Sequence, residues 1–282
     1  MAAPETAQDT DWLRICRRAA SALRSILEDR PSTAERVREV GTTGEGGDRT
    51  LLIDAAAEDA VFAELEQLHD EGLRFTAVSE ERGRIDFGSP DTLVVVDPID
   101  GSVNAKRGLP HHSISIAVAD GATMADVFFA YVHDFGPGEE WVARRGQGAW
   151  LDGRRLPTEP AERRGEDGKL ELLGIESADP RWIRDAADEL AARAYRLRAI
   201  GTIASTLCQV AAARLDGMVS LRASRAVDAA AGQLIVREAG GHVAFTACET
   251  PLGAPLDLEP HSPVVAARTE RGLEELARVP RV

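Results

Sequence analysis

One short segment constrains the fold of this chain more than any other, because it joins a buried strand to a pair of acids. The apolar run Leu93-Val94-Val95-Val96 leads directly into Asp97-Pro98-Ile99-Asp100. Clustered β-branched residues predict a strand over 93–96, which would deliver both carboxylates to its carboxyl-terminal edge. Pro98 stiffens the turn between them. Asp97, Asp100 and the Ile99 carbonyl could therefore supply three oxygen ligands to hard cations.

The next two residues, Gly101 and Ser102, suit a phosphate group. Their backbone N–H groups, together with the positive end of a helix dipole if a helical turn starts there, would face an incoming anion. An Asp-x-x-Asp turn is equally common as a plain capping or turn motif, so its meaning depends on the other acids of the chain.

Three further acidic positions follow apolar runs or begin helices. Asp54 ends the run Leu51-Leu52-Ile53; it either caps the next helix, which its position alone favours, or faces the same pocket. Glu80-Glu81 follows a strand-like run over 75–78, where an acid pair is most often part of a solvated loop. Asp228 opens an alanine-rich helix, where an N-cap is the simplest interpretation.

The amino-acid composition restricts the kind of molecule that this chain can bind. The 282 residues carry 47 acidic and 33 basic side chains, a formal net charge of −14 that repels nucleic acids and anionic membranes. Divalent cations would let such a chain bind an anionic phosphate ester. No stretch approaches roughly 18 consecutive apolar residues, and the N-terminus lacks a secretory pattern. Three separated cysteines, Cys16, Cys208 and Cys248, suit a reducing compartment. We expect a cytoplasmic protein with no nucleic-acid or membrane partner.

Hydrophobic spacing predicts two halves of different character. The first half has amphipathic helices over 11–27 and 55–68. Strands follow over 93–96, 113–119 and 125–133, with a hairpin over 140–151. After a polar linker over 159–169, strands alternate with helices, which is typical of a layered α/β unit. The expected elements are strands over 170–175, 195–200, 218–221 and 264–267, with helices ending at 194, over 204–215, over 228–238 and at the C-terminus.

We therefore expect an N-terminal α+β domain over residues 1–155, which carries most metal ligands. A C-terminal α/β domain over 156–282 would carry a substrate loop and the last acid. The boundary falls between Leu151 and Lys169, where the polar linker lies.

The order of these acids resembles that of the inositol monophosphatase family. The matching motifs are Ser79-Glu80-Glu81, Asp97-Pro98-Ile99-Asp100-Gly101-Ser102 and Ala226-Val227-Asp228-Ala229-Ala230-Ala231-Gly232. The likeness covers nearly the whole chain. Segments 104–110 and 200–208 look most like the archaeal-type branch, whose members dephosphorylate both inositol monophosphate and fructose 1,6-bisphosphate.

The resemblance implies a layered αβαβα sandwich of the inositol monophosphatase/fructose-1,6-bisphosphatase type, usually a homodimer, with two or three Mg²⁺ ions between its domains. Carried over by position, Glu80, Asp97 and the Ile99 carbonyl would bind the first Mg²⁺. Asp97, Asp100 and Asp228 would bind a second. A weaker third site could add Asp54 or share Glu80.

The implied reaction is hydrolysis of a small phosphate ester by water that a metal activates. Ser102, linked to Asp54, would orient that water and accept its proton, with Glu80 as a further catalytic residue. The implied substrate contacts are Asp100, Gly101, Ser102, Arg198, Gly201, Thr202 and Asp228.

The sequence departs from the family pattern at several positions. Val227 stands where many relatives carry Trp or Tyr, a packing change that should not touch the ligands. In an ungapped match, Leu221 replaces a glutamate that grips an inositol hydroxyl, which weakens the expectation of inositol specificity. A glycine-rich stretch over 41–50, with Glu45 and Asp48 as candidate outer ligands, would be the mobile metal loop. Leu51 replaces a lysine often found near its end.

Histidines and arginines supply weaker candidates. His111 and His112 would point apart on a strand and lack a spaced partner, so we do not predict a metal role. Four arginines could bind a remote substrate phosphate: Arg196, Arg198, Arg222 and Arg225. Arg198 is the best of them because it lies beside Ile200-Gly201.

Two other functions compete with hydrolysis of inositol monophosphate or fructose 1,6-bisphosphate. One is hydrolysis of another small phosphate, such as 3′-phosphoadenosine 5′-phosphate or histidinol phosphate. The other is a catalytically silent metal-binding relative. The intact acid set and Ser102 favour catalysis.

Overall fold

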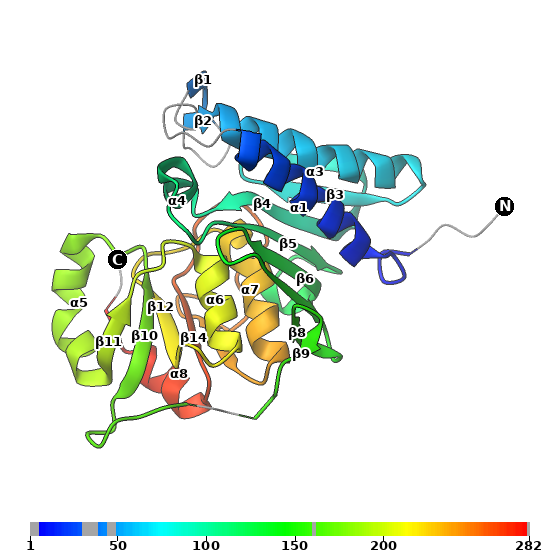
Figure 1. Ribbon diagram of the computed structural model, residues 1–282. Helices are drawn as coiled ribbons and strands as arrows, with labels where there is room; N and C mark the ends of the chain where they lie inside the picture. The colour runs from blue at the N-terminus through cyan, green and yellow to red at the C-terminus, as the bar shows by residue number, and fades with distance from the viewer. Residues whose placement is uncertain (1–5, 30–38, 44–48, 160–161, 281–282) are drawn as a thin grey trace.

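The structure is a computed structural model that describes residues 6–29, 39–43, 49–159 and 162–280. Helices and sheets alternate in five layers (Figure 1). A helix pair covers one face of a seven-stranded sheet, a second pair lies between this sheet and a five-stranded sheet, and further helices cover the far side. The predicted αβαβα sandwich is confirmed.

The first layer contains α1 (Trp12–Asp29) and α3 (Leu52–Asp70), which pack against each other. In α1, the buried Ile15, Ala19 and Leu23 recur at helical spacing, as one amphipathic face requires. Both predicted helices are confirmed, each slightly longer than expected. Ahead of α3, β1 (Glu39–Thr43) and β2 (Arg49–Leu51) form a separate antiparallel pair. Glu45 and Asp48, the candidate outer metal ligands, lie outside the described residues.

The larger sheet has the strand order β3-β4-β5-β6-β7-β8-β9. Its strands are β3 (Phe75–Ser79), β4 (Gly83–Asp100), β5 (Ser113–Ala119), β6 (Val127–Asp134), β7 (Glu139–Arg144), β8 (Gly148–Leu151) and β9 (Arg154–Arg155). The short α4 (Ser102–Arg107) and the 3-10 turn η1 (Met124–Asp126) interrupt the meander. Helices cover both faces of the sheet, so β5 and β6 are buried along their whole length.

Alternation along β4 decides where its acids point. Val94 and Val96 belong to the core under α1 and α3, whereas Val95 belongs to the core that includes α6 and α7. Side chains alternate along a strand. Asp97 follows Val95 by two residues and therefore faces the middle helices, at the junction of the two sheets.

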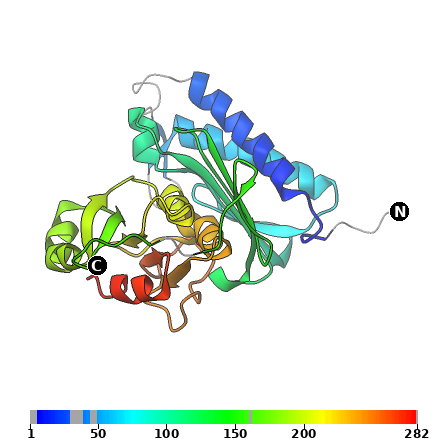
Figure 2. The same ribbon diagram turned by 60° about the horizontal axis from the view of Figure 1, so that its bottom comes forward.

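The middle layer contains α6 (Ile203–Ala211) and α7 (Ala226–Glu238), which contact both sheets (Figure 2). The smaller sheet has the order β11-β10-β12-β14-β13. Its strands are β10 (Leu170–Glu176), β11 (Ala194–Arg198), β12 (Gly217–Ser220), β13 (His242–Phe245) and β14 (Val264–Ala267). Outside it lie α5 (Pro180–Arg193) and α8 (Glu270–Leu276). Met218 packs toward the middle layer and Val219 toward the outer one.

Some boundaries differ from the prediction. The helix expected over 204–215 ends at Ala211, because the chain turns at Ala213, whose φ is 54°. The strand expected over 93–96 is the second half of the much longer β4. Within the described residues, no helix is both long and apolar enough to cross a bilayer. The proposed division into domains at the 159–169 connection stays a prediction.

Candidate active site

The end of β4 brings the first two acids into the interior. Asp97 is 2% exposed and Asp100 is 7% exposed. The Ile99 N–H donates to Asp97 Oδ1 at 2.9 Å, which fixes the carboxylate against its own turn. Asp97 still pairs in register with Ser115 of β5, and the pairing becomes irregular only between Asp97 and Asp100.

Asp100 is held by the start of α6. Its Oδ2 atom accepts hydrogen bonds from the Thr202 hydroxyl and from the Ala204 N–H, the latter at 2.7 Å. The same Thr202 oxygen accepts the Ser205 N–H at 3.2 Å as the N-cap of α6. Thr202 thus joins the loop before α6 in the C-terminal half to an acid of the N-terminal half.

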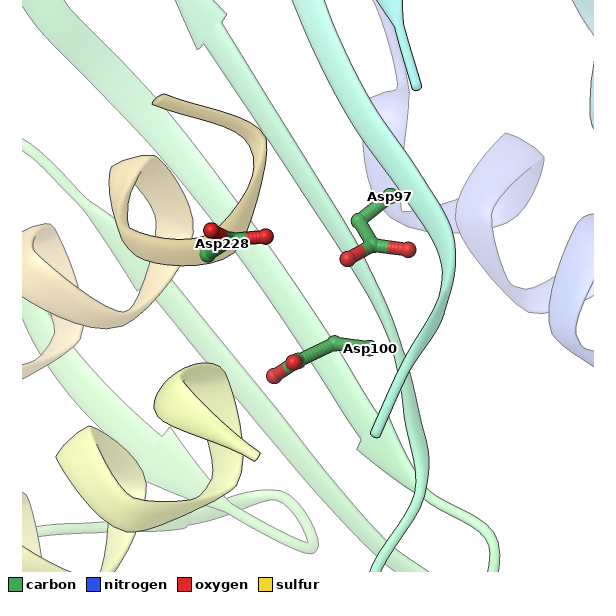
Figure 3. Close-up of side chains that lie close together, drawn as sticks. All are labelled: Asp97, Asp100 and Asp228. Carbon is green, nitrogen blue, oxygen red and sulfur yellow. The ribbon is translucent and has the colours of Figure 1, made fainter. Parts of the chain in front are cut away.

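Asp228 comes from the first turn of α7, as its third residue. Its Oδ2 atom accepts the Arg225 N–H at 3.1 Å, so it closes a capping box. It nevertheless faces the other acids: carboxylate oxygens of Asp97, Asp100 and Asp228 all lie within 4.8 Å of one another (Figure 3). The capping interpretation of Asp228 and the metal interpretation are therefore compatible.

Burial makes this cluster costly without a cation. Desolvation raises the pKa of Asp97 well above its usual value, and the neighbouring charges of Glu80, Asp100 and Asp228 raise it further. Desolvation likewise raises the pKa of Asp100, with Asp228 as the next cause. Carboxylate oxygens are the ligands that hard divalent cations prefer, so the donor set fits such an ion.

A pocket beside the cluster contains the remaining predicted catalytic groups. Its lining includes Asp54, Glu80, Asp97 and Ser102; Glu81, Pro98, Ile99 and Lys106 complete it. Asp54 lies in the first turn of α3, which begins at Leu52, so it faces the pocket instead of preceding the helix as an N-cap. Sequence reasoning missed Lys106, although it follows Ser102 by one helical turn of α4.

Glu80 has a different partner from the three aspartates. Its Oε1 atom lies 2.7 Å from Arg225 Nη1. Burial raises the pKa of Glu80 to about 7, although the Arg225 charge opposes the rise. Arg225, one of the candidates for a remote substrate phosphate, instead pairs with Glu80 and Asp228.

Two side chains, the buried Glu176 and the half-buried Asn104, hold the loop that contains Ile200 and Gly201, the predicted substrate loop. Glu176, at the end of β10, accepts the N–H groups of Ile200 and Gly201 at 3.1 Å and the Thr206 hydroxyl at 2.6 Å. Asn104 of α4 donates to the Ile200 carbonyl at 2.8 Å. Sequence reasoning missed both residues; an acid at a strand end was the available signal for Glu176.

Glycine is required where this loop meets the Asp100 turn. Gly101, with φ of 85°, would place an added Cβ 3.2 Å from the Gly201 carbonyl oxygen. The two halves of the predicted substrate site, Gly101-Ser102 and Gly201-Thr202, are thus brought together.

Other predicted residues lie away from the pocket lining. Arg198 is exposed at the end of β11 and donates to the Leu197 carbonyl at 2.8 Å. Leu221 is fully buried in the outer core, so this position offers no group to a substrate. Val227 is buried too. His111 Nδ1 pairs with Asp134 at 3.0 Å, and the His112 ring stacks on Phe135.

Comparison with known proteins agrees with this architecture. A model of the inositol monophosphatase family matches residues 9–280. The chain belongs to this family. As a member of the inositol monophosphatase family, it is a phosphatase that hydrolyses phosphate esters. The family is metal-dependent, and the carboxylate cluster could bind a metal ion.

Individual relatives extend over most of the chain. The fructose-1,6-bisphosphatase/inositol-1-monophosphatase of Archaeoglobus fulgidus is 33% identical over 92% of this chain and 94% of its own. The Nus factor SuhB of Escherichia coli is 33% identical over 82% of this chain and 84% of its own. A crystal structure of an inositol monophosphatase–fructose 1,6-bisphosphatase superposes with a TM-score of 0.80 at 25% identity, covering 96% of this chain and all of that one.

The hydrogen bonds that Glu176 accepts from the loop before α6 lead to a prediction for Glu176→Gln. A glutamine amide would direct N–H groups toward backbone donors, so the loop should shift and kcat/KM for a phosphate ester should fall roughly ten- to hundredfold. A matched control is Asp216→Asn, because Asp216 is also buried and accepts two backbone N–H groups, from Arg163 at 2.8 Å and Leu172 at 2.9 Å.

Both variants should lose stability, which thermal unfolding would measure. Only Glu176→Gln should lose catalytic efficiency, because Glu176 pairs with the Ser220 end of β12 whereas Asp216 precedes its other end. Equal losses of kcat/KM in the two variants would show that the hydrogen bonds of Glu176 have only a structural role.

Proposed function

We propose that the protein is a Mg²⁺-dependent phosphomonoester hydrolase that acts on inositol monophosphate, fructose 1,6-bisphosphate or both. The observation that carries the proposal is the convergence of Asp97, Asp100 and Asp228 beside a pocket that also contains Asp54 and Ser102. Carboxylates at this density suit metal-assisted displacement at phosphorus. The homodimer implied by the resemblance and the cytoplasmic location expected from the cysteines stay predictions.

Five groups would hold Mg²⁺: Asp97, Asp100 and Asp228 around one ion, with Glu80 and the Ile99 carbonyl extending the ligand set. Their burial and mutual repulsion support this assignment, since a divalent ion would relieve both. When bound, Mg²⁺ supplies two effects: it lowers the pKa of water and neutralises charge on the phosphoryl oxygens.

The protein's own groups would orient the reactants. Ser102 and Asp54 line the same pocket, so the hydroxyl can position the attacking water while the carboxylate receives the proton. Lys106 lines that pocket as well, and its ammonium group would offset phosphate charge. No covalent phosphoenzyme is required.

Substrate range follows from the groups around the loop at residue 201. Leu221 is buried and leaves no acid at that position to grip an inositol hydroxyl. Arg198 is exposed one residue before the segment Ala199–Gly201 and could reach a second phosphate of a sugar bisphosphate. These features favour a range that includes fructose 1,6-bisphosphate.

A phosphate-release assay tests the proposal directly. Inositol 1-phosphate, fructose 1,6-bisphosphate, 3′-phosphoadenosine 5′-phosphate and histidinol phosphate would be compared with Mg²⁺ and with EDTA. We expect Mg²⁺-dependent turnover of one or both of the first two. Preference for either of the others would identify the alternative enzyme, and no turnover of any would favour a silent relative.

Ser102→Ala tests the role of the Ser102 hydroxyl, which would position the attacking water and connect it to Asp54. Loss of the hydroxyl should lower kcat by roughly 10²–10⁴-fold, the usual range for general acid–base catalysis, with a smaller change in KM. Steady-state kinetics at saturating Mg²⁺ would measure both constants. An unchanged kcat with a much higher KM would make Ser102 a phosphate ligand only.

Arg198→Ala tests the bisphosphate assignment. A charge-assisted hydrogen bond contributes about 1.5–3 kcal/mol, so kcat/KM for fructose 1,6-bisphosphate should fall roughly tenfold or more. The value for inositol 1-phosphate should change little. Arg196→Ala is the matched control, since Arg196 is exposed two residues earlier on the same strand and lies over the Tyr195 ring. Equal losses for both substrates would make Arg198 structural.

A further inference from the structure

Arg225 bridges acids from the two halves of the active site. Its Nη1 atom lies 2.7 Å from Glu80 Oε1, and its Nη2 atom lies 3.4 Å from Asp228 Oδ1. Its backbone N–H donates to the other oxygen of Asp228 at 3.1 Å. Glu80 follows β3 and Asp228 begins α7, so one guanidinium group ties the large sheet to the middle helices.

The surroundings of Arg225 are strongly acidic. Its side chain is 20% exposed; burial lowers its pKa, but the charges of Asp228, Glu80 and Asp97 together outweigh that effect and raise it. Conversely, the Arg225 charge lowers the pKa of Glu80 and of Asp97. Arg225 therefore already neutralises part of the charge that a metal ion would neutralise.

Arg225 and a divalent ion also require the same atoms. A guanidinium hydrogen bond occupies a lone pair of Glu80 Oε1 and another of Asp228 Oδ1, and both residues belong to the proposed Mg²⁺ ligand set. Two cations that share ligands at short range repel each other, and the repulsion is weakly screened in a buried site.

We propose that Arg225 is a resident cation of the metal centre, which holds the acid cluster together and competes with Mg²⁺ for Glu80 and Asp228. The inference rests on the Mg²⁺ site of the proposed function and adds a regulatory role for one residue. Arg225 stabilises the site before the ion binds and lowers the affinity for the ion. The metal occupancy would then respond to Mg²⁺ concentration over a higher range than the carboxylates alone would set.

Melting temperatures of Arg225→Gln in EDTA and in saturating Mg²⁺ test the first half of the proposal. The loss of stability should be large in EDTA, where the acids repel one another, and much smaller in Mg²⁺. The matched control is Arg164→Gln. The Arg164 side chain is 18% exposed and pairs with two carboxylates, Glu162 at 2.6 Å and Glu275 at 2.8 Å. The melting temperature of Arg164→Gln should fall by the same amount in both buffers.

Calorimetric titration with Mg²⁺ alone tests the second half without an activity measurement. Arg225→Gln should bind Mg²⁺ roughly tenfold more tightly than the wild type, a change within the usual range for interactions between neighbouring groups. Arg225→Lys keeps the charge and should bind nearly as the wild type does, which separates charge from a general disturbance of the site.

Several results would overturn the proposal. Weaker Mg²⁺ binding by Arg225→Gln would make Arg225 an organiser of the ligands, and an equal loss of stability in both buffers would make it a structural ion pair. A tenfold gain in Arg225→Lys as well would exclude charge as the cause. Absence of any Mg²⁺ binding by the wild type would overturn the metal site and this inference together, whereas Mg²⁺ binding without phosphatase activity would overturn only the proposed function.

Discussion

Mutual repulsion among buried carboxylates is the constraint on which this structure depends. Asp97, Asp100 and Asp228 place oxygens within 4.8 Å of one another at positions largely closed to water. Solvent cannot screen their charges there, and hydrogen bonds from Ile99, Ala204 and Thr202 satisfy only some of the oxygens. The cluster therefore favours either protonation or a cation, which links folding of the site to its chemistry.

The layered fold is what brings these acids together. The large sheet delivers Asp97 and Asp100 at the end of β4, and α7, packed between the sheets, delivers Asp228 (Figure 3). The loop before α6 then connects the two halves through the hydrogen bond between Thr202 and Asp100. Glu176 and Asn104 hold this loop from the sides of the two sheets. A shift of either sheet would accordingly move both the carboxylate cluster and the loop before α6.

Much of this arrangement could be predicted from local patterns. Acids at the ends of apolar runs marked Asp97, Asp100 and Glu80, and hydrophobic spacing marked most helices and strands. Contacts between side chains that tertiary packing brings together could not be predicted from these patterns. Glu176 and its loop are separated by more than twenty residues, and Arg225 of the C-terminal half contacts Glu80 of the N-terminal half. Spacing carries no information on such pairs, which is why Arg225 was grouped with arginines for a remote phosphate.

The same limit explains the position of Arg198, whereas the burial of Leu221 could have been predicted from the sequence. Proximity in sequence to the substrate loop favoured Arg198, yet strand β11 leaves its side chain exposed and outside the pocket lining. Leu221 follows β12 and continues its alternation into the outer core, so its burial was available from the strand period. Local sequence patterns thus indicate the chemistry that each residue can supply. The packing of the two sheets determines which residues come into contact.

Phosphate release by Asp97→Asn at saturating Mg²⁺, compared with the wild type, tests the central claim most directly. Asparagine keeps the size of the side chain and removes one negative charge. The neighbouring carboxylates repel that charge in the wild type. The account predicts that circular dichroism stays native and that melting in EDTA occurs at an equal or higher temperature, because repulsion falls. It also predicts that Mg²⁺-dependent turnover drops to background. Near-normal Mg²⁺-dependent turnover in this variant would contradict the assignment of the carboxylate cluster as the catalytic metal site.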